Sequence, residues 1–331
     1  MSRQTEKILS LIEEQKTCNE ICECLQITNK QLYHKLTNLK AKGFFLDRKY
    51  FSNGEIVYVP IYKVNEIREL NHSVNTYPSI MTSPNELEFN TLVVSDLHFG
   101  NKLERLDLIN RIYNYCIKNN INIIFCCGDI IDGTFSRGEQ RIKNVYSQLL
   151  YFIRNYPFDK NILTFAVGGD HDLSSLKRQG LDMVEGIKNY RHDIVIQNYN
   201  NGFVNIKNEK ILLNHPNRNN LHKQLGDATI VFKGHFHRYQ TIYNGDNRLE
   251  ILIPSLSDIN QTFPTALKVH MWFKNGKISN IDVNQILFGE KEYIINTNTF
   301  NFPDREVMNK NNEEDVSNNN IKKLIKKSNK E

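Results

Sequence analysis

Residues 161–172 read NILTFAVGGDHD, an apolar run that ends in two glycines, two aspartates and a histidine. The run has the length and composition of a buried strand, and the glycines permit a tight turn at its end. Asp170, His171 and Asp172 therefore follow at the point where the chain would leave a sheet. Whether this turn carries chemistry depends on what other strands bring to the same place.

Four further apolar runs end in the same way. The runs TLVV, INIIFCC, ILLN and ATIVFK are followed by a second set of acidic and imidazole side chains: Asp96, His98, Asp129, Asp132, His215, His235 and His237. In open α/β folds, ligands bind at the carboxyl ends of strands, so we expect these clusters to meet at one edge. One such cluster alone would be ordinary surface polarity, but five in sequence predict a single functional site.

The blocks DLH, GDIID, GGDHD, H and GHFH, in this order, resemble the calcineurin-like metallophosphoesterases over about residues 89–300. The resemblance implies an α/β fold, a four-layer α-β-β-α sandwich, over residues 89–302. It also implies a centre of two divalent metal ions whose ligands are Asp96, His98, Asp129, Asp170, His215, His235 and His237, with Asp129 bridging. His171 would be the general acid or a transition-state donor, Asp172 its catalytic companion that orients the imidazole, and Asp132 a supporting residue behind the ligands.

Two metal ions explain these residue types chemically. Such a pair clamps a phosphoryl group and converts a bridging water to hydroxide at neutral pH, so no Ser, Thr or Cys nucleophile is needed. Mixed carboxylate and imidazole ligands favour Mn²⁺, with Fe, Zn or Mg as alternatives. The family pattern has Asn where this chain has Asp170. The extra negative charge is expected to hold the cations more tightly and to make them poorer Lewis acids.

Residues 1–75 have a different pattern. Amphipathic helices are predicted over 5–15, 17–26 and 28–42, followed by a hairpin through Asn53-Gly54. Three helices and a hairpin in this order resemble a winged-helix domain, with 28–42 as the recognition helix. The side chains predicted to contact DNA are Asn29, Lys30, Gln31, Tyr33 and Lys35. Residues 76–88 are predicted to be a linker, and the polar residues 303–331 a disordered tail.

Bulk composition limits the compartment and the partners. The 331 residues carry a formal charge of +5, which is compatible with a polyanionic partner without demonstrating one. The apolar stretches are too short to span a bilayer, and the N-terminus has no secretory hydrophobic region. Six cysteines without paired CxxC zinc spacing fit a reducing compartment. We therefore expect a cytoplasmic protein with no membrane partner.

The sequence indicates the substrate less clearly than it indicates phosphoester hydrolysis. The block GDIIDGTFSRGEQ resembles the small, exonuclease-bearing subunit of archaeal D-family DNA polymerases and places Arg137 and Arg141 beyond the metal-bearing turn. With the winged-helix-like region, it favours a DNA-directed nuclease or nuclease-like subunit. Two alternatives remain open: a small-molecule nucleotide phosphodiesterase or phosphatase, and a DNA-binding regulator with a degenerate phosphoesterase domain. A protein partner or an oligomer is compatible with all three.

Overall fold

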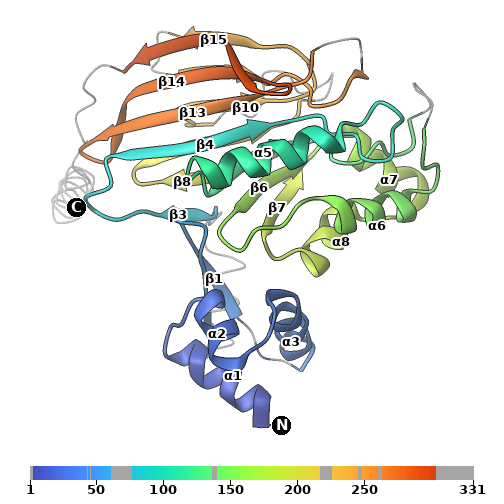
Figure 1. Cartoon of the computed structure of the whole chain (residues 1–331), viewed down its shortest axis with the longest axis vertical. Helices are drawn as coiled ribbons and strands as arrows, with labels where there is room; N and C mark the ends of the chain where they lie inside the picture. Colours follow the sequence, from blue (N-terminus) through green and yellow to red (C-terminus); the bar gives the residue numbers. More distant parts are fainter. Residues whose placement is uncertain are drawn as a thin grey trace, which may run out of the picture.

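The computed structural model describes residues 3–42, 44, 46–60, 77–135, 140–216, 226–244, 248–259 and 263–302. Figure 1 shows two large sheets with helices beside them and a three-helix unit at the N-terminal end. The predicted tail 303–331 and the predicted contact Arg137 lie outside the described residues. Among the helices that the structure describes, none is long and apolar enough to cross a membrane.

The N-terminal helices are α1 (Arg3–Glu13), α2 (Cys18–Leu25) and α3 (Asn29–Ala41). Two of them start at N-caps, because Thr17 and Thr28 each accept a hydrogen bond from the third backbone N–H of the helix. The side-chain oxygens of Glu20 and Gln31 accept a hydrogen bond from the backbone N–H of the cap residue, which completes two capping boxes. The three predicted helices are thus confirmed, although their role as a winged helix stays a prediction.

The hairpin consists of β1 (Leu46–Phe51) and β2 (Ile56–Pro60), which pair antiparallel across a turn in which Gly54 has a positive φ of 82°. β3 (Ser79–Met81) then pairs with β1 on one side and with β8 (Asn201–Ile206) on the other. The hairpin is therefore part of an eight-stranded sheet of order β11-β12-β10-β9-β8-β3-β1-β2. Within the predicted linker 76–88, residues 79–81 form strand β3 and connect the two regions.

The other strands of this sheet are β8 (Asn201–Ile206), β9 (Glu209–Asn214), β10 (Ile230–Lys233), β11 (Gln240–Asn244) and β12 (Arg248–Leu252). The second sheet has seven strands in the order β15-β14-β13-β4-β5-β6-β7. Its parallel half contains β4 (Glu88–Val94), β5 (Ile123–Cys127), β6 (Leu163–Gly168) and β7 (Ile194–Tyr199). Its antiparallel half contains β13 (Thr265–Lys274), β14 (Lys277–Phe288) and β15 (Glu292–Asn301).

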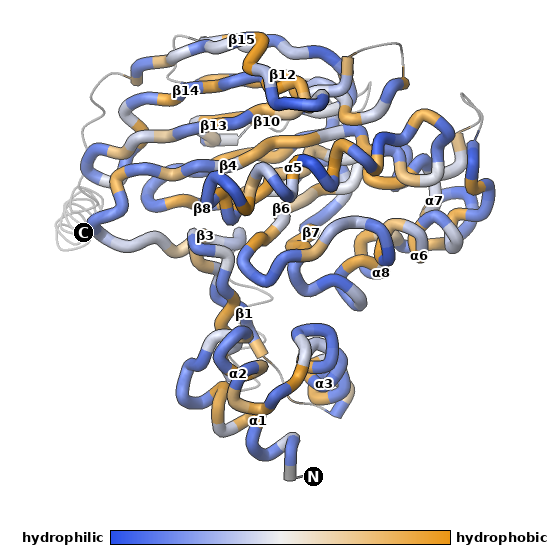
Figure 2. The backbone as a smooth tube through the Cα atoms, viewed as in Figure 1, coloured by the Kyte–Doolittle hydropathy of each residue, from blue (hydrophilic) through white to orange (hydrophobic). Residues whose placement is uncertain are grey.

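The central strands are buried on both faces, as their uninterrupted apolar sequences require. Phe125 of β5 meets Phe165 of β6 and Phe232 of β10 between the sheets, with ring centroids 6.2 and 5.9 Å apart. Ile124 and Cys126 of β5 instead pack in the core under the outer helices. Figure 2 shows hydrophobic residues following β4 and β6 through the middle of the molecule.

The outer helices are α5 (Leu106–Lys118), α6 (Val145–Asn155), α7 (Asp170–Gln179) and α8 (Met183–Tyr190). α5, α6 and α8 share a buried core with the seven-stranded sheet, whereas α1 and α2 pack on β2 of the other sheet. The predicted α/β sandwich of two sheets with helices is confirmed. The five apolar runs predicted to be strands form β4, β5, β6, β9 and β10.

Candidate metal centre

The predicted site residues follow strand ends in both sheets. Asp96 and His98 follow β4, Asp129 follows β5, and α7 begins at Asp170 directly after β6. In the eight-stranded sheet, parallel strands β9 and β10 are followed by the three remaining imidazoles, those of His215, His235 and His237. The structure brings all seven side chains to one edge of the sandwich, on the side of α7 in Figure 1. The predicted convergence of the clusters is therefore confirmed.

One group of ligand atoms consists of the side chains of Asp129, Asp170, His215 and His235. His215 Nε2 lies 3.2 Å from both Asp129 Oδ2 and Asp170 Oδ1. His235 Nδ1 lies 3.3 Å from Asp170 Oδ1. These four side chains thus offer two carboxylates and two imidazoles to one point in space, a donor set typical of a transition-metal site.

A second group consists of Asp96, His98 and His237. His237 Nε2 lies 3.1 Å from Asp96 Oδ1, and His98 Nε2 lies 4.0 Å from the same oxygen. His98 Nε2 is also 3.9 Å from Asp129 Oδ2. Asp129 therefore faces both groups, as a carboxylate bridging two cations must.

Unsatisfied polar atoms test whether these groups fit metal ions. Asp96 Oδ1 and both ring nitrogens of His98 are buried without a hydrogen-bond partner, and both side chains are almost fully buried. A buried polar atom without a partner costs free energy, so such atoms point to a missing ligand. Asp96 Oδ1 and His98 Nε2 belong to the same group, and a divalent cation between them would satisfy both. The donor set fits the group that the family resemblance implies.

Most of the candidate ligands share an unusual backbone conformation. Five of the seven candidate ligands have positive φ angles of 48–75°, a region that residues other than glycine rarely adopt: Asp96, His98, Asp129, His235 and His237. Such conformations persist only where the surrounding structure imposes them, and they cluster at functional sites. Gly128 and Gly169 permit the close approach of neighbouring turns, because a Cβ at either would lie within 2.6 Å of His215 or Asp129.

The electrostatics of the centre couple the carboxylates to the imidazoles. Burial alone would raise the pKa of Asp129, but the neighbouring imidazoles, His215 first, lower it below its usual range. Burial likewise acts to lower the pKa of His215, whereas Asp129 and Asp170 raise it well above its usual value. A divalent cation between these groups would replace the imidazole protons, since ligand imidazoles must be neutral.

His171 lies at the border of the second group. Its backbone N–H donates to Asp129 Oδ1 at 2.9 Å, and its ring stands edge-on to His98 with centroids 4.5 Å apart. Its Nδ1 lies 2.8 Å from the carbonyl oxygen of Asp132, which can only accept a hydrogen bond. Burial works to lower the pKa of His171, but the nearby Asp129, Asp132 and Asp170 raise it above its usual value.

Asp172 has another role than the predicted one. Its carboxylate accepts three backbone hydrogen bonds of 2.8–3.0 Å, from Gly169, Ile130 and Ile131. It therefore fixes the turns after β5 and β6 to each other and does not orient the imidazole of His171, so that prediction is wrong. Burial and the neighbouring Asp129 raise the pKa of Asp172 to about 7, against the lowering effect of its N–H donors.

The orienting role falls to the backbone carbonyl of Asp132, whereas its Oδ1 lies farther away, 3.6 Å from His98 Nδ1 and 3.8 Å from His171 Nδ1. Sequence reasoning missed its partner Asn101, whose Nδ2 donates to the same oxygen at 2.9 Å. It also missed Ser255, which donates to the carbonyl of Asp96 at 3.1 Å. Neither residue belongs to a recognisable motif, because both lie in loops outside the apolar runs and the clusters that follow them.

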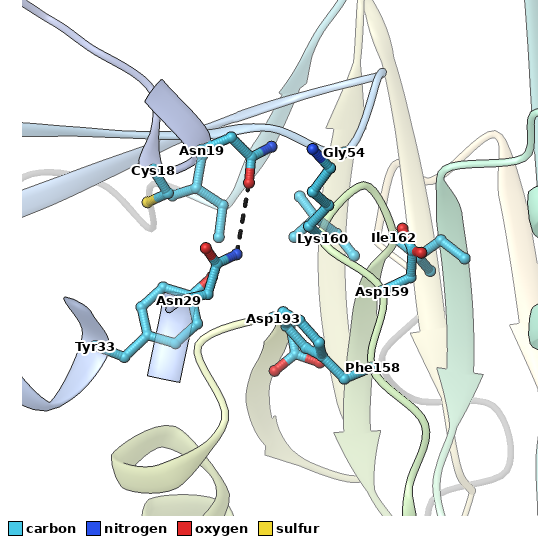
Figure 3. Close-up of a pocket in the computed structure, with 12 residues that line it drawn as sticks. Cys18, Asn19, Asn29, Tyr33, Gly54, Phe158, Asp159, Lys160, Ile162 and Asp193 are labelled. Atoms are coloured by element: carbon cyan, nitrogen blue, oxygen red, sulfur yellow. Dashed lines mark hydrogen bonds between the residues drawn. The ribbon is translucent and has the colours of Figure 1, made fainter. Parts of the chain in front are cut away.

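The predicted DNA contacts on α3 are only partly exposed. Tyr33 is buried, and its ring stacks on His192 with centroids 4.5 Å apart, so the prediction that it faces a DNA groove is wrong. Asn29 is half-buried and donates to Asn19, and Lys35 donates to Gln4. Figure 3 shows Asn29 and Tyr33 at a small pocket that Phe158 and Asp193 also line.

Lys30 and Gln31 are exposed, although Gln31 also caps its own helix. Arg141 is close to the metal-bearing turn in sequence but is bound elsewhere, since it pairs with Glu104 and its guanidinium lies 4.5 Å from the ring centroid of Tyr151. Of the described predicted contacts, Lys30 and Gln31 on the first turn of α3 are thus exposed, and the Gln31 amide oxygen is also engaged at the N-cap.

Residues 89–286 match the family model of the calcineurin-like phosphoesterases. The chain therefore belongs to this family, and it is a hydrolase that acts on phosphoester bonds. Members of the family bind two divalent metal ions, and the two ligand groups described above meet that requirement. The comparison with curated proteins finds no match.

Several solved structures are similar in part. An archaeal phosphodiesterase is 15% identical, with 62% of this chain and 100% of that chain covered and a TM-score of 0.39. The nuclease MPE of Pseudomonas putida is 14% identical, with coverage of 57% and 85% and a TM-score of 0.32. A dimetal phosphatase from Danio rerio is 10% identical, with coverage of 65% and 99% and a TM-score of 0.41. At these scores the neighbours indicate nothing about the substrate of this chain.

Proposed function

We propose that this chain is a two-metal phosphodiesterase that cleaves DNA. The observation that carries the phosphodiesterase part is the pair of ligand groups that meet at Asp129, with His171 beside them. Asp96, His98 and His237 would hold one cation, and Asp170, His215 and His235 the other. Two bound divalent cations would supply a hydroxide nucleophile and charge stabilisation for the phosphoryl group. Mn²⁺ fits the mixed ligands best, ahead of Fe, Zn or Mg.

His171 supplies the proton that the leaving group needs. Because Asp132 accepts the hydrogen bond of Nδ1, the other ring nitrogen, Nε2, is left to face the substrate. The bond between phosphorus and the leaving oxygen breaks, its electron pair remains on that oxygen, and the oxygen takes the proton from Nε2. The backbone carbonyl of Asp132 keeps the imidazole in this orientation, and Asn101 in turn donates to the Asp132 carboxylate.

Asp170 sets the charge of the centre. Its Oδ1 lies within 3.3 Å of nitrogen atoms of both His215 and His235, so an amide there would keep the shape of the site and remove one negative charge. We expect Asp170→Asn to bind Mn²⁺ about tenfold more weakly and to turn over faster when saturated with metal. Metal titration and the hydrolysis rate at saturating Mn²⁺ measure the two effects separately. Unchanged metal affinity with equal or lower activity would contradict this role.

DNA is favoured by the N-terminal region. Three helices and a hairpin precede the phosphoesterase domain, and Lys30 and Gln31 are exposed at the start of α3, where a DNA backbone could be contacted. The test is cleavage of labelled single- and double-stranded DNA with Mn²⁺, beside hydrolysis of bis-p-nitrophenyl phosphate. His171→Ala should lose most activity on DNA, where the leaving alkoxide needs a proton, and less on the aryl ester, whose leaving group is more acidic.

A second candidate is a phosphodiesterase of small nucleotides. The pairing of Arg141 with Glu104 and the burial of Tyr33 favour it, because both side chains are withdrawn from the set of DNA contacts. Hydrolysis of the small ester and of nucleotides without cleavage of DNA would select this function. DNA binding without any hydrolysis would instead select a regulator with a degenerate phosphoesterase domain.

A further inference from the structure

The loop after β5 is fastened to α7 beside the metal centre. Gly133 has a φ of 65°, and a Cβ on it would lie 2.1 Å from the carbonyl oxygen of His171. The next backbone N–H, that of Thr134, donates to Ser174 Oγ at 2.9 Å, and this hydroxyl donates to the His171 carbonyl at 2.6 Å. The loop is thereby fixed against the first turn of α7 and leads directly to Phe135.

Phe135 lies on the imidazole of His171. The two ring centroids are 4.6 Å apart, with planes inclined by 48°. The guanidinium of Arg178 lies over the same phenyl ring, 5.2 Å from its centroid, and its Nη1 donates to the carbonyl of Thr134 at 3.2 Å. His171, Ser174 and Arg178 are spaced three and four residues apart, so one face of α7 holds the loop, the aromatic ring and the cation together.

The ring is placed where the leaving group departs. The leaving oxygen takes its proton from His171. The nucleoside attached to that oxygen therefore lies next to the Phe135 ring, which contacts the imidazole. Phe135 is half-buried and Arg178 is exposed, so the guanidinium can move off the ring without any change in the core. Nucleic-acid bases stack on aromatic rings and on Arg guanidinium planes, and this pair offers both surfaces.

We propose that Phe135 and Arg178 form a leaving-group subsite that stacks the base of the departing nucleoside. The inference rests on the proposed function, because it uses His171 as the proton donor. It adds a substrate requirement that the metal ions cannot impose: the leaving side of the scissile phosphodiester carries an aromatic base. The metal centre would bind the phosphate, and Phe135 and Arg178 would bind the base of the leaving group.

The test uses a short single strand of thymidines and a matched strand with one abasic sugar at an internal position. In the second strand the abasic sugar is on the leaving side at one flanking bond and on the opposite side at the other. For the wild-type chain with Mn²⁺, we expect cleavage to fall about 5- to 100-fold at the first bond and to change little at the second. The phosphate-bearing product identifies which sugar has left.

Variants separate stacking from a structural role. Phe135→Leu keeps apolar packing against His171 but cannot stack a base, so it should lose the difference between the two strands. Phe135→Trp should keep that difference. Arg178→Gln should lose part of it, whereas Lys177→Gln, which removes a neighbouring exposed charge from α7, should not change it.

The outcomes distinguish this inference from the proposed function. If Phe135→Leu lowers cleavage of both strands equally, the ring only positions His171 and the subsite is wrong. If the wild-type chain cleaves DNA but does not respond to the abasic sugar, the subsite is wrong and the proposed function stands. If it hydrolyses bis-p-nitrophenyl phosphate but no DNA strand, the proposed substrate and the subsite are wrong together.

Discussion

Two regions of this molecule gather histidine and carboxylate side chains, and they differ in whether the polar atoms of these groups have hydrogen-bond partners. Where Tyr33 of α3 stacks on His192, just before β7, Tyr58 Oη lies 2.8 Å from His192 Nδ1. Beside it, the buried Arg191 donates to both oxygens of Asp193 and to backbone carbonyls. At the metal centre, by contrast, Asp96 and His98 are buried with polar atoms that have no hydrogen-bond partner.

The contrast separates stabilising polar groups from functional ones. Polar atoms that are paired within the chain fix one packing arrangement and need nothing from outside. Unpaired buried atoms on residues with strained backbone lower stability, and they persist because a ligand satisfies them. From this difference we expect substitutions at the metal centre to change metal binding and catalysis. Substitutions at the contact of Tyr33 and Tyr58 with His192, called the interface below, should instead change stability.

The largest effect is expected for Asp129→Asn. Asp129 faces both ligand groups, so its loss weakens both metal positions. The rate of bis-p-nitrophenyl phosphate hydrolysis should fall by at least about 100-fold, because even residues behind the ligands typically contribute 10- to 100-fold. Metal content after dialysis should fall with it.

Asp107→Asn is the matched control for that variant, since Asp107 is a half-exposed carboxylate paired with Arg105 on the same domain. It should keep both the hydrolysis rate and the metal content of the wild-type chain. If Asp129→Asn retained wild-type turnover, the hypothesis that the two ligand groups hold a pair of metal ions bridged by Asp129 would be wrong.

Tyr33→Ala tests the other side of the comparison. The ring is buried and stacked on His192, so its removal should lower the free energy of unfolding by about 4 kcal/mol, as for other buried aromatic side chains. Urea unfolding measures this change, with Lys30→Ala on the exposed face of the same helix as the control. Hydrolysis of the small ester by the folded variant should not change, and a loss of DNA cleavage without a loss of stability would restore Tyr33 as a DNA contact.

The same contrast explains what the sequence could predict. The convergence of the seven candidate ligands was predictable because each follows an apolar strand closely, so local order along the chain determines where the side chains meet. The role of Asp172 was not, because its three N–H donors come from turns after two different strands. The burial of Tyr33 was not predictable either. The face of α3 is polar, and its aromatic partner, His192, comes from a distant part of the chain.

A smaller effect is expected from pH at the interface. Burial, with the charges of Arg48 and Lys40, lowers the pKa of His192 to about 4, below the unfolded value of about 6.5. The unfolded chain therefore binds the proton more tightly, so this contribution to stability is complete above about pH 6.5 and is lost as the pH falls toward 4. The loss at pH 4 is about 3 kcal/mol. His192 also faces Tyr33, Tyr58 and Thr37, which carry no charge in this range.

Urea unfolding of the wild-type chain and of His192→Asn at pH 7 and pH 4 measures that loss. Other groups titrate over the same interval, so the relevant quantity is the difference between the two chains at each pH. The stability advantage of the wild-type chain should shrink by about 3 kcal/mol at pH 4. An advantage that is independent of pH would mean that His192 is not held in its neutral form by this interface.

The smallest effect is expected for Arg141→Gln. Arg141 lies near the site in sequence, yet its guanidinium is paired with Glu104 and stacked on Tyr151, in the same satisfied state as the groups around His192. Exposed ion pairs of this kind contribute about 1 kcal/mol or less, so stability should change little. DNA cleavage at low salt should also change by no more than about twofold. A larger fall that disappears at high salt would show that the guanidinium leaves Glu104 for a phosphate, because phosphate contacts weaken steeply as salt rises. That result would make Arg141 a DNA contact although it is paired with Glu104. A hydrogen-bonded ion pair within the chain would then no longer be enough to identify a residue that only stabilises the fold.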